Sequence, residues 1–285
     1  MTLLEAIILG AVQGATEFLP ISSSGHLVLG NELMGLGEPN LLFDIVLHVG
    51  TLVAVMGYYR RDIWAVIRDL YLGITNGLKE RSIDAFLAGE GARLAVLVVL
   101  ASIPTGVLGL LLERVLDPEG GERLVTASVV CGILIVNGAM LFSNRWLMDR
   151  EAEDRKGRWT LWGVTPLIAL GIGLIQGIAV MPGVSRSGAT ITLALLLGVS
   201  RNEAARFSFL LSIPAILGAL VLKLDPAIFA GAGAQTAAPY LVGAAVAALV
   251  GLVCLVWLVK LLRDARFHHF AWYCWAVGIT GLVLL

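Results

Sequence analysis

The sequence predicts an all-α integral membrane protein with six transmembrane helices and two re-entrant helical hairpins, arranged as repeats of inverted topology. The 285-residue chain is 58% hydrophobic and only 14% charged, and its mean hydropathy of +0.88 excludes an ordinary soluble domain. Several long apolar stretches reach the roughly 20 residues that a helix needs to span a bilayer. In addition, one short polar pattern occurs twice, at an offset of 163 residues.

The expected elements follow the same order in each half of the chain. Residues 2–36 are broken at Pro20, and residues 161–199 are broken at Met181-Pro182-Gly183, so each segment is predicted to form a hairpin. Each hairpin is followed by three apolar stretches that are expected to cross the membrane. These stretches are Leu41–Tyr59, Leu94–Leu112 and Leu124–Phe142 in the first half, and Phe207–Leu222, Tyr240–Val259 and Phe270–Leu285 in the second.

Basic residues indicate the orientation of these crossings. Three connections, residues 60–91, 144–160 and 260–269, hold 13 of the 20 Lys and Arg residues. Such connections are retained in the cytoplasm, so both termini are expected outside. Because each half crosses three times, the second half is inverted relative to the first. The predicted units are a first repeat over residues 1–143, a cytoplasmic linker over 144–160 and a second repeat over 161–285.

The duplicated polar pattern coincides with the two hairpin breaks. Gln13-Gly14, seven residues and Ser22-Ser23-Ser24-Gly25 correspond to Gln176-Gly177, seven residues and Ser185-Arg186-Ser187-Gly188. Polar groups are costly at membrane depth, so the two copies are expected to form one site. Serines that follow a proline break favour a helix start, and the free N–H groups of helix starts bind phosphate. Two such ends predict a cradle for an anion, such as a diphosphate.

Three side chains in these motifs carry reactive chemistry. Arg186 offers a bidentate fork for phosphate oxygens, although a structural ion pair is the alternative. His26 follows Ser23 by three residues, which allows a serine–histidine pair, attack of the histidine on phosphorus, or a buried structural histidine. We favour attack by His26, because imidazole is nucleophilic near neutral pH without a partner base. Glu17 is suited to orient His26, to act as a base or to hold a divalent cation.

Polar residues outside the motifs carry less information. Asp44 and His48 are spaced i, i+4 in an apolar stretch and are expected to pair with each other. Arg60 and Arg61 are expected to anchor the chain at the cytoplasmic surface. The net charge of −1 gives no indication of a nucleic-acid partner. The three cysteines have no metal-like spacing and are expected to be apolar packing residues: Cys131, Cys254 and Cys274.

The two motifs resemble the signatures of the undecaprenyl-diphosphate phosphatases, also called bacitracin-resistance proteins. Residues 13–20 with 22–26 are similar to the first signature, and residues 182–190 are similar to the second. The likeness extends along nearly the whole chain. It implies an integral-membrane phosphatase that converts undecaprenyl diphosphate to undecaprenyl phosphate and phosphate. Such an enzyme recycles the lipid carrier of bacterial cell-wall synthesis and confers bacitracin resistance.

The resemblance also implies a location, a cofactor and site residues. The expected location is the bacterial plasma (inner) membrane, with the site facing the periplasm. A homodimer is a possible oligomeric state. The cofactor is a divalent cation, Mg²⁺ or Ca²⁺. Gln13 stands where many members carry a second glutamate. Glu17 is therefore the main expected ligand of the cation, with Gln13 as a weaker ligand. The implied active-site residues are Glu17, Ser23, His26, Ser185, Arg186 and Thr190, and the further substrate-binding residues are Ser22, Ser24, Gly25, Ser187 and Gly188.

Two rival functions follow from the same features. A second lipid-phosphatase family requires a histidine six residues after its motif arginine and an aspartate four residues further on. Thr192 and Leu196 occupy those positions here, so that mechanism is excluded. A polyprenyl-phosphate transporter or flippase remains the alternative, because inverted repeats with re-entrant hairpins are typical of transporters. Release of phosphate distinguishes the enzyme from the transporter.

Overall fold

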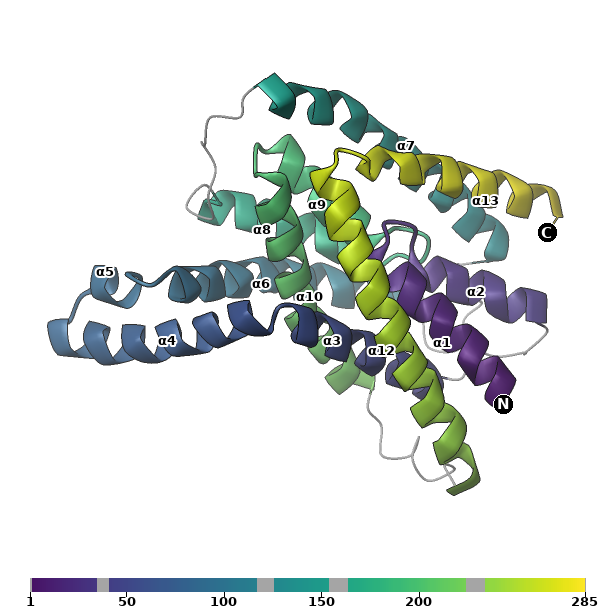
Figure 1. Ribbon diagram of the computed structural model, residues 1–285, viewed down its shortest axis with the longest axis horizontal. Coiled ribbons are helices and arrows are strands. Elements are labelled where there is room, and N and C mark those ends of the chain that lie inside the picture. The colour runs from purple at the N-terminus through teal and green to yellow at the C-terminus, as the bar shows by residue number, and fades with distance from the viewer. Residues whose placement is uncertain (1, 35–40, 117–125, 154–163, 224–233, 285) are drawn as a thin grey trace.

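The computed structural model describes residues 2–34, 41–116, 126–153, 164–223 and 234–284, and every element in these ranges is helical (Figure 1). The prediction of an all-α chain is confirmed. The elements are α1 (Leu3–Phe18), α2 (Ser23–Met34), α3 (Leu41–Tyr58), α4 (Arg60–Glu80), α5 (Ile83–Phe86), α6 (Glu90–Leu116), α7 (Ala127–Glu153), α8 (Pro166–Ile178), α9 (Arg186–Leu196), α10 (Arg201–Lys223), α12 (Ala234–Arg263), η2 (Phe267–His269) and α13 (Phe270–Leu284).

Both predicted helix breaks are confirmed. The first helix, α1, ends at Phe18 and α2 begins at Ser23, whereas α8 ends at Ile178 and α9 begins at Arg186. Each break contains one residue in the left-handed region, Ser22 with φ 72° and Gly183 with φ 96°. The left-handed conformation is strained for serine but not for glycine. The contacts around Ser22 must therefore stabilise the first break. Residues 35, 36 and 161–163 of the predicted hairpins lie outside the described residues.

Four of the described helices are long and apolar enough to cross a membrane. They contain the segments Glu90–Leu112, Ala127–Trp146, Arg201–Leu222 and Ala237–Arg263. The pair α3 and α4 would make a fifth span, but the two helices meet at an angle of 75°. The last helix, α13, has 15 residues. The chain is therefore a multi-pass helical membrane protein.

Two connections differ from the prediction. Residues 60–91 were expected to be only a cytoplasmic connection, but they form the 21-residue helix α4 and the short helix α5. Residues 144–153 of the predicted linker continue α7, which ends at Glu153, and residues 154–160 lie outside the described residues. Both helices carry charged side chains, and for this reason hydropathy alone excluded these segments from the predicted helices.

Small residues bring the first limb of each hairpin close to a helix of the other half. The α1 helix packs along α12, and α8 packs along α6. A Cβ atom at Gly14 would lie 2.6 Å from the Ala247 carbonyl oxygen. At the equivalent position of the second motif, a Cβ atom at Gly177 would lie 2.7 Å from the Cβ of Leu108. These contacts require glycine, and they fix the position of α1 along α12 and of α8 along α6.

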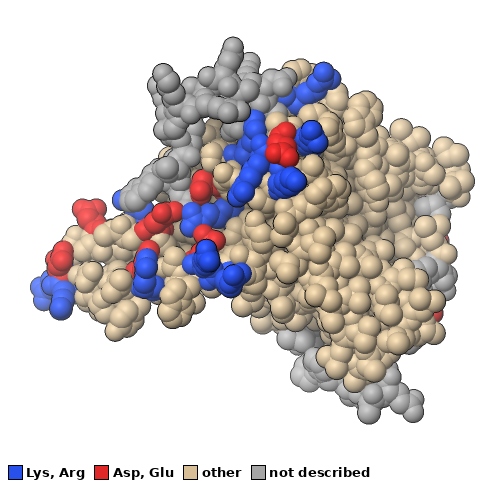
Figure 2. All heavy atoms as spheres, in the orientation of Figure 1, with Lys and Arg blue, Asp and Glu red and all other residues tan. Residues whose placement is uncertain are grey.

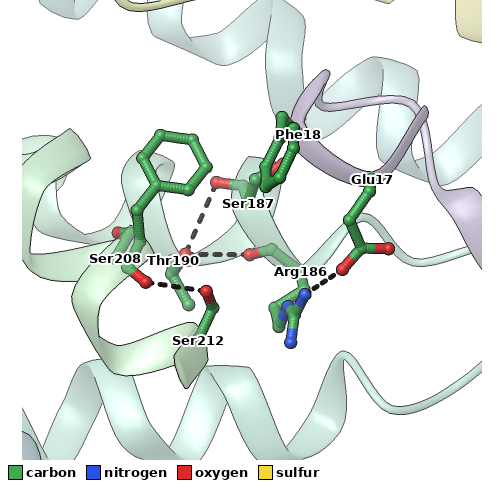
Figure 3. A pocket seen from close by; sticks show the side chains of 8 residues that line it. Glu17, Phe18, Arg186, Ser187, Thr190, Ser208 and Ser212 are labelled. Atoms are coloured by element: carbon green, nitrogen blue, oxygen red, sulfur yellow. Dashed lines mark hydrogen bonds and ion pairs between the residues drawn. The ribbon is translucent and has the colours of Figure 1, made fainter. Parts of the chain in front are cut away.

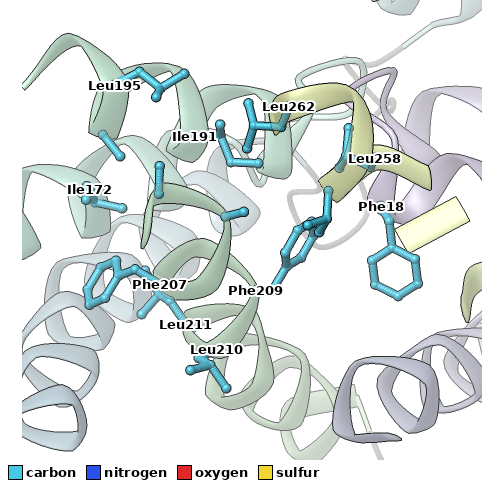
Figure 4. Packing of buried hydrophobic residues seen from close by; sticks show 14 of the residues in the cluster. Phe18, Ile172, Ile191, Leu195, Phe207, Phe209, Leu210, Leu211, Leu258 and Leu262 are labelled. Carbon is cyan, nitrogen blue, oxygen red and sulfur yellow. The ribbon is translucent and has the colours of Figure 1, made fainter. Parts of the chain in front are cut away.

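An apolar core lies directly beneath the hairpin breaks (Figure 4). Phe18 ends α1 and packs edge-on against Phe209 of α10, with ring centroids 5.9 Å apart. Tyr59, at the bend between α3 and α4, lies against the same ring at 6.1 Å. Leu258 and Leu262 of α12 belong to the same cluster. The residue before Phe18 is Glu17, so this packing fixes the backbone from which the carboxylate projects.

Replacing Gly14 by alanine tests the close contact between α1 and α12. Gly14→Ala should destabilise the chain by about 1–3 kcal/mol, because the added methyl group meets backbone rather than a flexible side chain. The control is Gly57→Ala in α3, where an added Cβ has no neighbour within 4 Å. Gly57→Ala should be neutral or slightly stabilising. Thermal unfolding of both variants in the same detergent measures the difference, and equal midpoints would show that the contact is not close.

Candidate active site

One buried amide ties the two hairpin breaks together. The amide nitrogen of Asn137, in the middle of α7, donates to the Pro20 carbonyl oxygen at 2.9 Å. Its side-chain oxygen accepts from the Ser185 N–H at 3.3 Å. Asn137 is 3% exposed, and its two partners belong to different motifs. The breaks therefore hold a fixed relative position, which brings the two copies of the motif to one place.

Glu17 lies at the centre of this place. One carboxylate oxygen accepts from the Arg186 guanidinium of the other hairpin (Figure 3). The other oxygen accepts from Ser23 Oγ at 2.6 Å and from Gln13 Nε2 at 2.9 Å. His48 Nε2 lies 3.8 Å from that second oxygen. The carboxylate is only 3% exposed, so these donors replace the water that a buried charge has lost.

The serines of both motifs begin helices, as predicted. Ser185 is the N-cap of α9 and its Oγ accepts from the Gly188 N–H at 3.1 Å, and Ser22 Oγ accepts from the Gly25 N–H at 3.3 Å. A Cβ atom at Gly25 would lie 3.2 Å from the Cα of Gly183. The N-terminus of α2 thus reaches the opposite break. Two positive helix ends accordingly lie close together at the site.

The side chains of two other residues of the second motif form hydrogen bonds with backbone carbonyl groups. Thr190 Oγ1 donates to the Arg186 carbonyl oxygen at 2.8 Å, and Ser187 Oγ lies 3.5 Å from the Leu19 carbonyl oxygen. Both side chains are buried. The Ser187 hydroxyl therefore links the first turn of α9 to the first hairpin, whereas the Thr190 hydroxyl bonds within α9. Their predicted role in substrate binding stays a prediction.

His26 forms its side-chain hydrogen bonds with Ser22 and Tyr273, and none of its described contacts is with Ser23 or Glu17. Its Nδ1 donates to the Ser22 carbonyl oxygen at 2.8 Å, and its Nε2 lies 2.9 Å from the Tyr273 hydroxyl of α13. The two rings stack with centroids 5.6 Å apart. With Nδ1 as the donor, Nε2 accepts the Tyr273 proton, so both ring nitrogens are engaged. A pair of Ser23 and His26, one of the three alternatives for this histidine, is not formed, and Ser23 pairs with Glu17 instead.

His48 is a member of the site that the sequence did not indicate. The expected pair with Asp44 forms through the backbone, because His48 Nδ1 donates to the Asp44 carbonyl oxygen at 2.7 Å. This bond directs Nε2 toward Glu17. Both Asp44 and His48 line the same cleft as Ser23. A histidine in an otherwise apolar stretch was the available signal, but its distance in sequence from both motifs obscured it.

The site is the polar end of a cleft of about 630 Å³. Glu17, Ser23, His48 and Arg186 lie at this end, together with Ser22, Ser24 and Ser185. The remaining walls are mostly apolar and come largely from α6 and α10. They include Leu27, Ile45, Leu110, Val180, Ile216, Leu220 and Leu222. One cleft thus offers charge at one end and an apolar lining along its sides.

A second, small cavity lies on another side of the Glu17–Arg186 pair (Figure 3). Its volume of about 10 Å³ suits roughly one water molecule. Thr190, Ser208 and Ser212 line it. The Ser208 hydroxyl is buried and has no hydrogen-bond partner among the described residues, which a water here would supply.

Comparison with known proteins gives the family. The family model of the bacitracin resistance protein BacA matches residues 6–280, which is nearly the whole chain. The chain belongs to this family. Relatives called undecaprenyl-diphosphatase come from Desulfatibacillum aliphaticivorans, with 42% identity over 79% of this chain and 78% of the relative, and from Rubrobacter xylanophilus, with 43% identity over 85% and 84%. The relative from Geobacter sulfurreducens is 40% identical over 87% and 85%.

The side chains at the site, as arranged without substrate, do not fit the Mg²⁺ or Ca²⁺ ion that the resemblance implies. Both oxygens of Glu17 already accept hydrogen bonds, and Gln13 presents its nitrogen to the carboxylate. The Gln13 oxygen is buried without a partner in the described part of the chain, but one amide oxygen is a weak ligand. Among the described residues, no group of three or more His, Cys, Asp or Glu side chains is arranged to hold a metal ion. The residues in place do not form a cation cage.

Asn137→Ala tests whether the tie between the breaks positions the site. The change leaves the Ser185 N–H without its partner and leaves the Pro20 carbonyl only the contact with Cys274 Sγ at 3.9 Å. A buried unpaired group costs about 1–3 kcal/mol. The prediction is a lower unfolding temperature and a kcat reduced by at least tenfold, with KM changed much less. Kinetics on reconstituted protein measure both constants. The exposed Asn76→Ala is the control, and a variant that loses stability but keeps kcat would show that Asn137 is only structural.

Proposed function

We propose that this chain is an undecaprenyl-diphosphatase, which hydrolyses undecaprenyl diphosphate to undecaprenyl phosphate and phosphate. The observation that carries the proposal is the cleft, because its two regions match the two regions of this lipid. The diphosphate fits the end with Arg186, Ser23 and two helix N-termini, and the polyprenyl chain fits the apolar walls. Membership of the bacitracin resistance family and the names of the relatives support the same substrate.

The hydrogen bonds around Glu17 suggest how the reaction proceeds. Arg186 binds the terminal phosphate through its guanidinium fork and in doing so releases one oxygen of Glu17. Glu17 then accepts the proton of Ser23, whose Oγ already donates to it at 2.6 Å. The Ser23 oxygen bonds to the terminal phosphorus while the bond to the bridging oxygen breaks, and undecaprenyl phosphate leaves with the proton that Glu17 had accepted. Water then hydrolyses the phosphoserine, which releases phosphate and restores the Ser23 hydroxyl.

This mechanism assigns His26 a positioning role. Its ring is held by Ser22 and Tyr273, and it forms no hydrogen bond with Ser23 or Glu17 among the described contacts. It therefore fixes the first turn of α2, from which Ser23 projects. His48 takes the electrostatic role beside the carboxylate, because Nε2 lies near the oxygen that receives the proton. Attack by His26 would require its ring to leave both partners.

The membrane topology proposed for the chain is six crossings and two re-entrant hairpins, in inverted repeats over residues 1–143 and 161–285. The packing of α1 on α12 and of α8 on α6 joins equivalent elements of the two halves, which supports the repeats. Lys and Arg side chains gather on one side of the molecule (Figure 2), which supports a cytoplasmic side. The cleft residues Leu110 and Leu222 lie near the C-terminal ends of α6 and α10, away from the basic connection of residues 60–91, which adjoins the start of both helices. This position supports a cleft that opens toward the periplasm in the bacterial inner membrane.

The divalent cation is proposed to arrive with the diphosphate. Mg²⁺ is commonly bound by substrate phosphates and by only one or two carboxylates, which needs no cage in the empty protein. The ion would neutralise phosphate charge. Removal of the cation with a chelator should therefore lower activity, while the substrate-free protein should bind Mg²⁺ or Ca²⁺ weakly in calorimetry. Tight binding of either ion without lipid would contradict this order.

Release of phosphate from undecaprenyl diphosphate by the purified, reconstituted protein tests the function. Wild-type protein should release phosphate, and Arg186→Ala should lose about 10²–10³-fold in kcat, because a desolvated donor to the phosphate is removed. Arg186→Lys should remain poor, because an ammonium group lacks the planar fork. Movement of the lipid between leaflets without phosphate release would instead identify a transporter. Near-normal turnover by Arg186→Lys would show that the fork is not required.

Rapid-quench trapping distinguishes the roles of Ser23 and His26. The mechanism predicts an acid-stable phosphoserine that is absent from Ser23→Ala, with a loss of turnover deeper than that of His26→Ala. Tyr273→Phe should resemble a mild form of His26→Ala, because it removes only one partner of the ring. An acid-labile phosphohistidine would assign the attack to His26. Absence of both phosphorylated species would indicate direct attack by water on the substrate.

A further inference from the structure

Two serines of α10 face the ion pair of the site from within an apolar segment. Ser208 and Ser212 are four residues apart, which places them on one face of the helix. Both are buried, and together with Thr190 they line the cavity of about 10 Å³. Glu17 and Arg186 line the same cavity. Because hydrocarbon offers no hydrogen bonds, a hydroxyl on this face of α10 needs a partner inside the protein.

The two serines differ in their hydrogen bonds. Ser212 Oγ donates to the Phe209 carbonyl oxygen of the same helix at 2.7 Å. Ser208 Oγ is buried and has no hydrogen-bond partner among the described residues. Most buried polar groups in proteins are paired, because an unpaired one costs free energy. The Ser208 hydroxyl therefore indicates a ligand in the cavity that the surrounding side chains do not themselves provide.

The groups around the cavity suit one water molecule. Thr190 Oγ1 and Ser212 Oγ each donate to a backbone carbonyl group, so they offer lone pairs to the cavity. Ser208 and the guanidinium of Arg186 offer protons. A water molecule can donate to the first pair and accept from the second, and the volume suits about one water. A metal ion would instead meet the positive charge of Arg186.

The proposed reaction creates a need for this water. Arg186 releases one oxygen of Glu17 when it binds the terminal phosphate, and a buried carboxylate that loses a donor is destabilised. Figure 3 shows Arg186 between Glu17 and the hydroxyl groups that line the cavity. A water in the cavity is thus next to the oxygen that the guanidinium releases.

We propose that Ser208 is a positioning residue, which holds one water molecule against the pair of Glu17 and Arg186. While the pair is intact, the water accepts from the guanidinium. When the guanidinium turns to the phosphate, the water donates a hydrogen bond to the released oxygen of Glu17. The carboxylate then keeps the number of donors that it had before, and it is ready to accept the proton of Ser23. The inference rests on the proposed function, because the exchange begins when the phosphate binds.

Radiolytic footprinting of the full chain detects the water without any need for turnover. X-rays split bound water into hydroxyl radicals, which oxidise the side chains that the water touches. Phe18 and Phe209 line the cavity and are buried, and both should be oxidised in the wild-type protein. Phe207 and Phe267 are also buried but line neither the cavity nor the cleft, so they should stay unmodified. Ser208→Val should abolish the oxidation, because its side chain occupies part of the cavity and offers no hydrogen bond.

Kinetics of the reconstituted Ser208→Val variant test the role of the water in turnover. We expect kcat to fall about tenfold, which corresponds to the loss of one hydrogen bond to a charged group, with KM nearly unchanged. The unfolding temperature should change little, because an apolar group replaces both the hydroxyl and the water. The matched control is Ser143→Val in α7, where the hydroxyl donates to the Met140 carbonyl oxygen of its own helix. Its kcat should stay near that of the wild-type protein.

Three results would overturn the proposal. Absence of oxidation at Phe18 and Phe209 in the wild-type protein would show that no water is bound there. Loss of the oxidation in Ser208→Val with a normal kcat would show that the water does not serve the reaction. A joint fall of kcat and unfolding temperature would assign Ser208 to packing alone. A wild-type chain that is oxidised at both phenylalanines but releases no phosphate would overturn the proposed function and the role in turnover, while the water site would stand.

Discussion

The ion pair between Glu17 and Arg186 is the interaction on which the site depends. A carboxylate that is 3% exposed is stable only with a compensating partner, and here that partner comes from the other hairpin. The pair can form only if both breaks reach the same depth. The glycine contacts set the position of α1 along α12 and of α8 along α6, and Asn137 fixes the distance between the breaks. Helix packing throughout the bundle therefore determines the geometry of one charge pair.

Duplication of the motif gave the two hairpins one scaffold and different chemistry. At the offset of 163 residues, Ser23 corresponds to Arg186, and Glu17 corresponds to Val180. The first copy thus contributes a hydroxyl and a carboxylate, and the second contributes a cation. Both copies retain the serine that caps the helix start, Ser22 and Ser185. The shared part binds an anion by helix ends, and the divergent part makes the site reactive.

Features that depend on neighbouring residues, such as the helix breaks, were predicted from the sequence. Features that depend on contacts between distant residues were not. Pro20 and Pro182 located both breaks, because proline and glycine end helices through local sterics. Asn137 and the contact of His48 with Glu17 were not predicted, because each residue acts on a motif far along the chain and nothing next to it in sequence indicates this. The spacing of Ser23 and His26 suggested a pair, but Glu17 and Tyr273 provided better-placed partners. The helix α4 was missed because its charges lower its hydropathy, although its periodicity is helical.

The apolar walls of the cleft affect how the enzyme meets its substrate. Leu110 and Leu222 line the cleft and are 45% and 62% exposed, so the lining continues onto the lipid-facing surface of the helices. A polyprenyl chain can then enter and leave sideways, without passing through water. Collisions occur by diffusion in two dimensions, and saturation follows the mole fraction of substrate in the leaflet rather than its bulk molarity. Diluting the membrane with inert phospholipid would slow turnover even at constant total substrate.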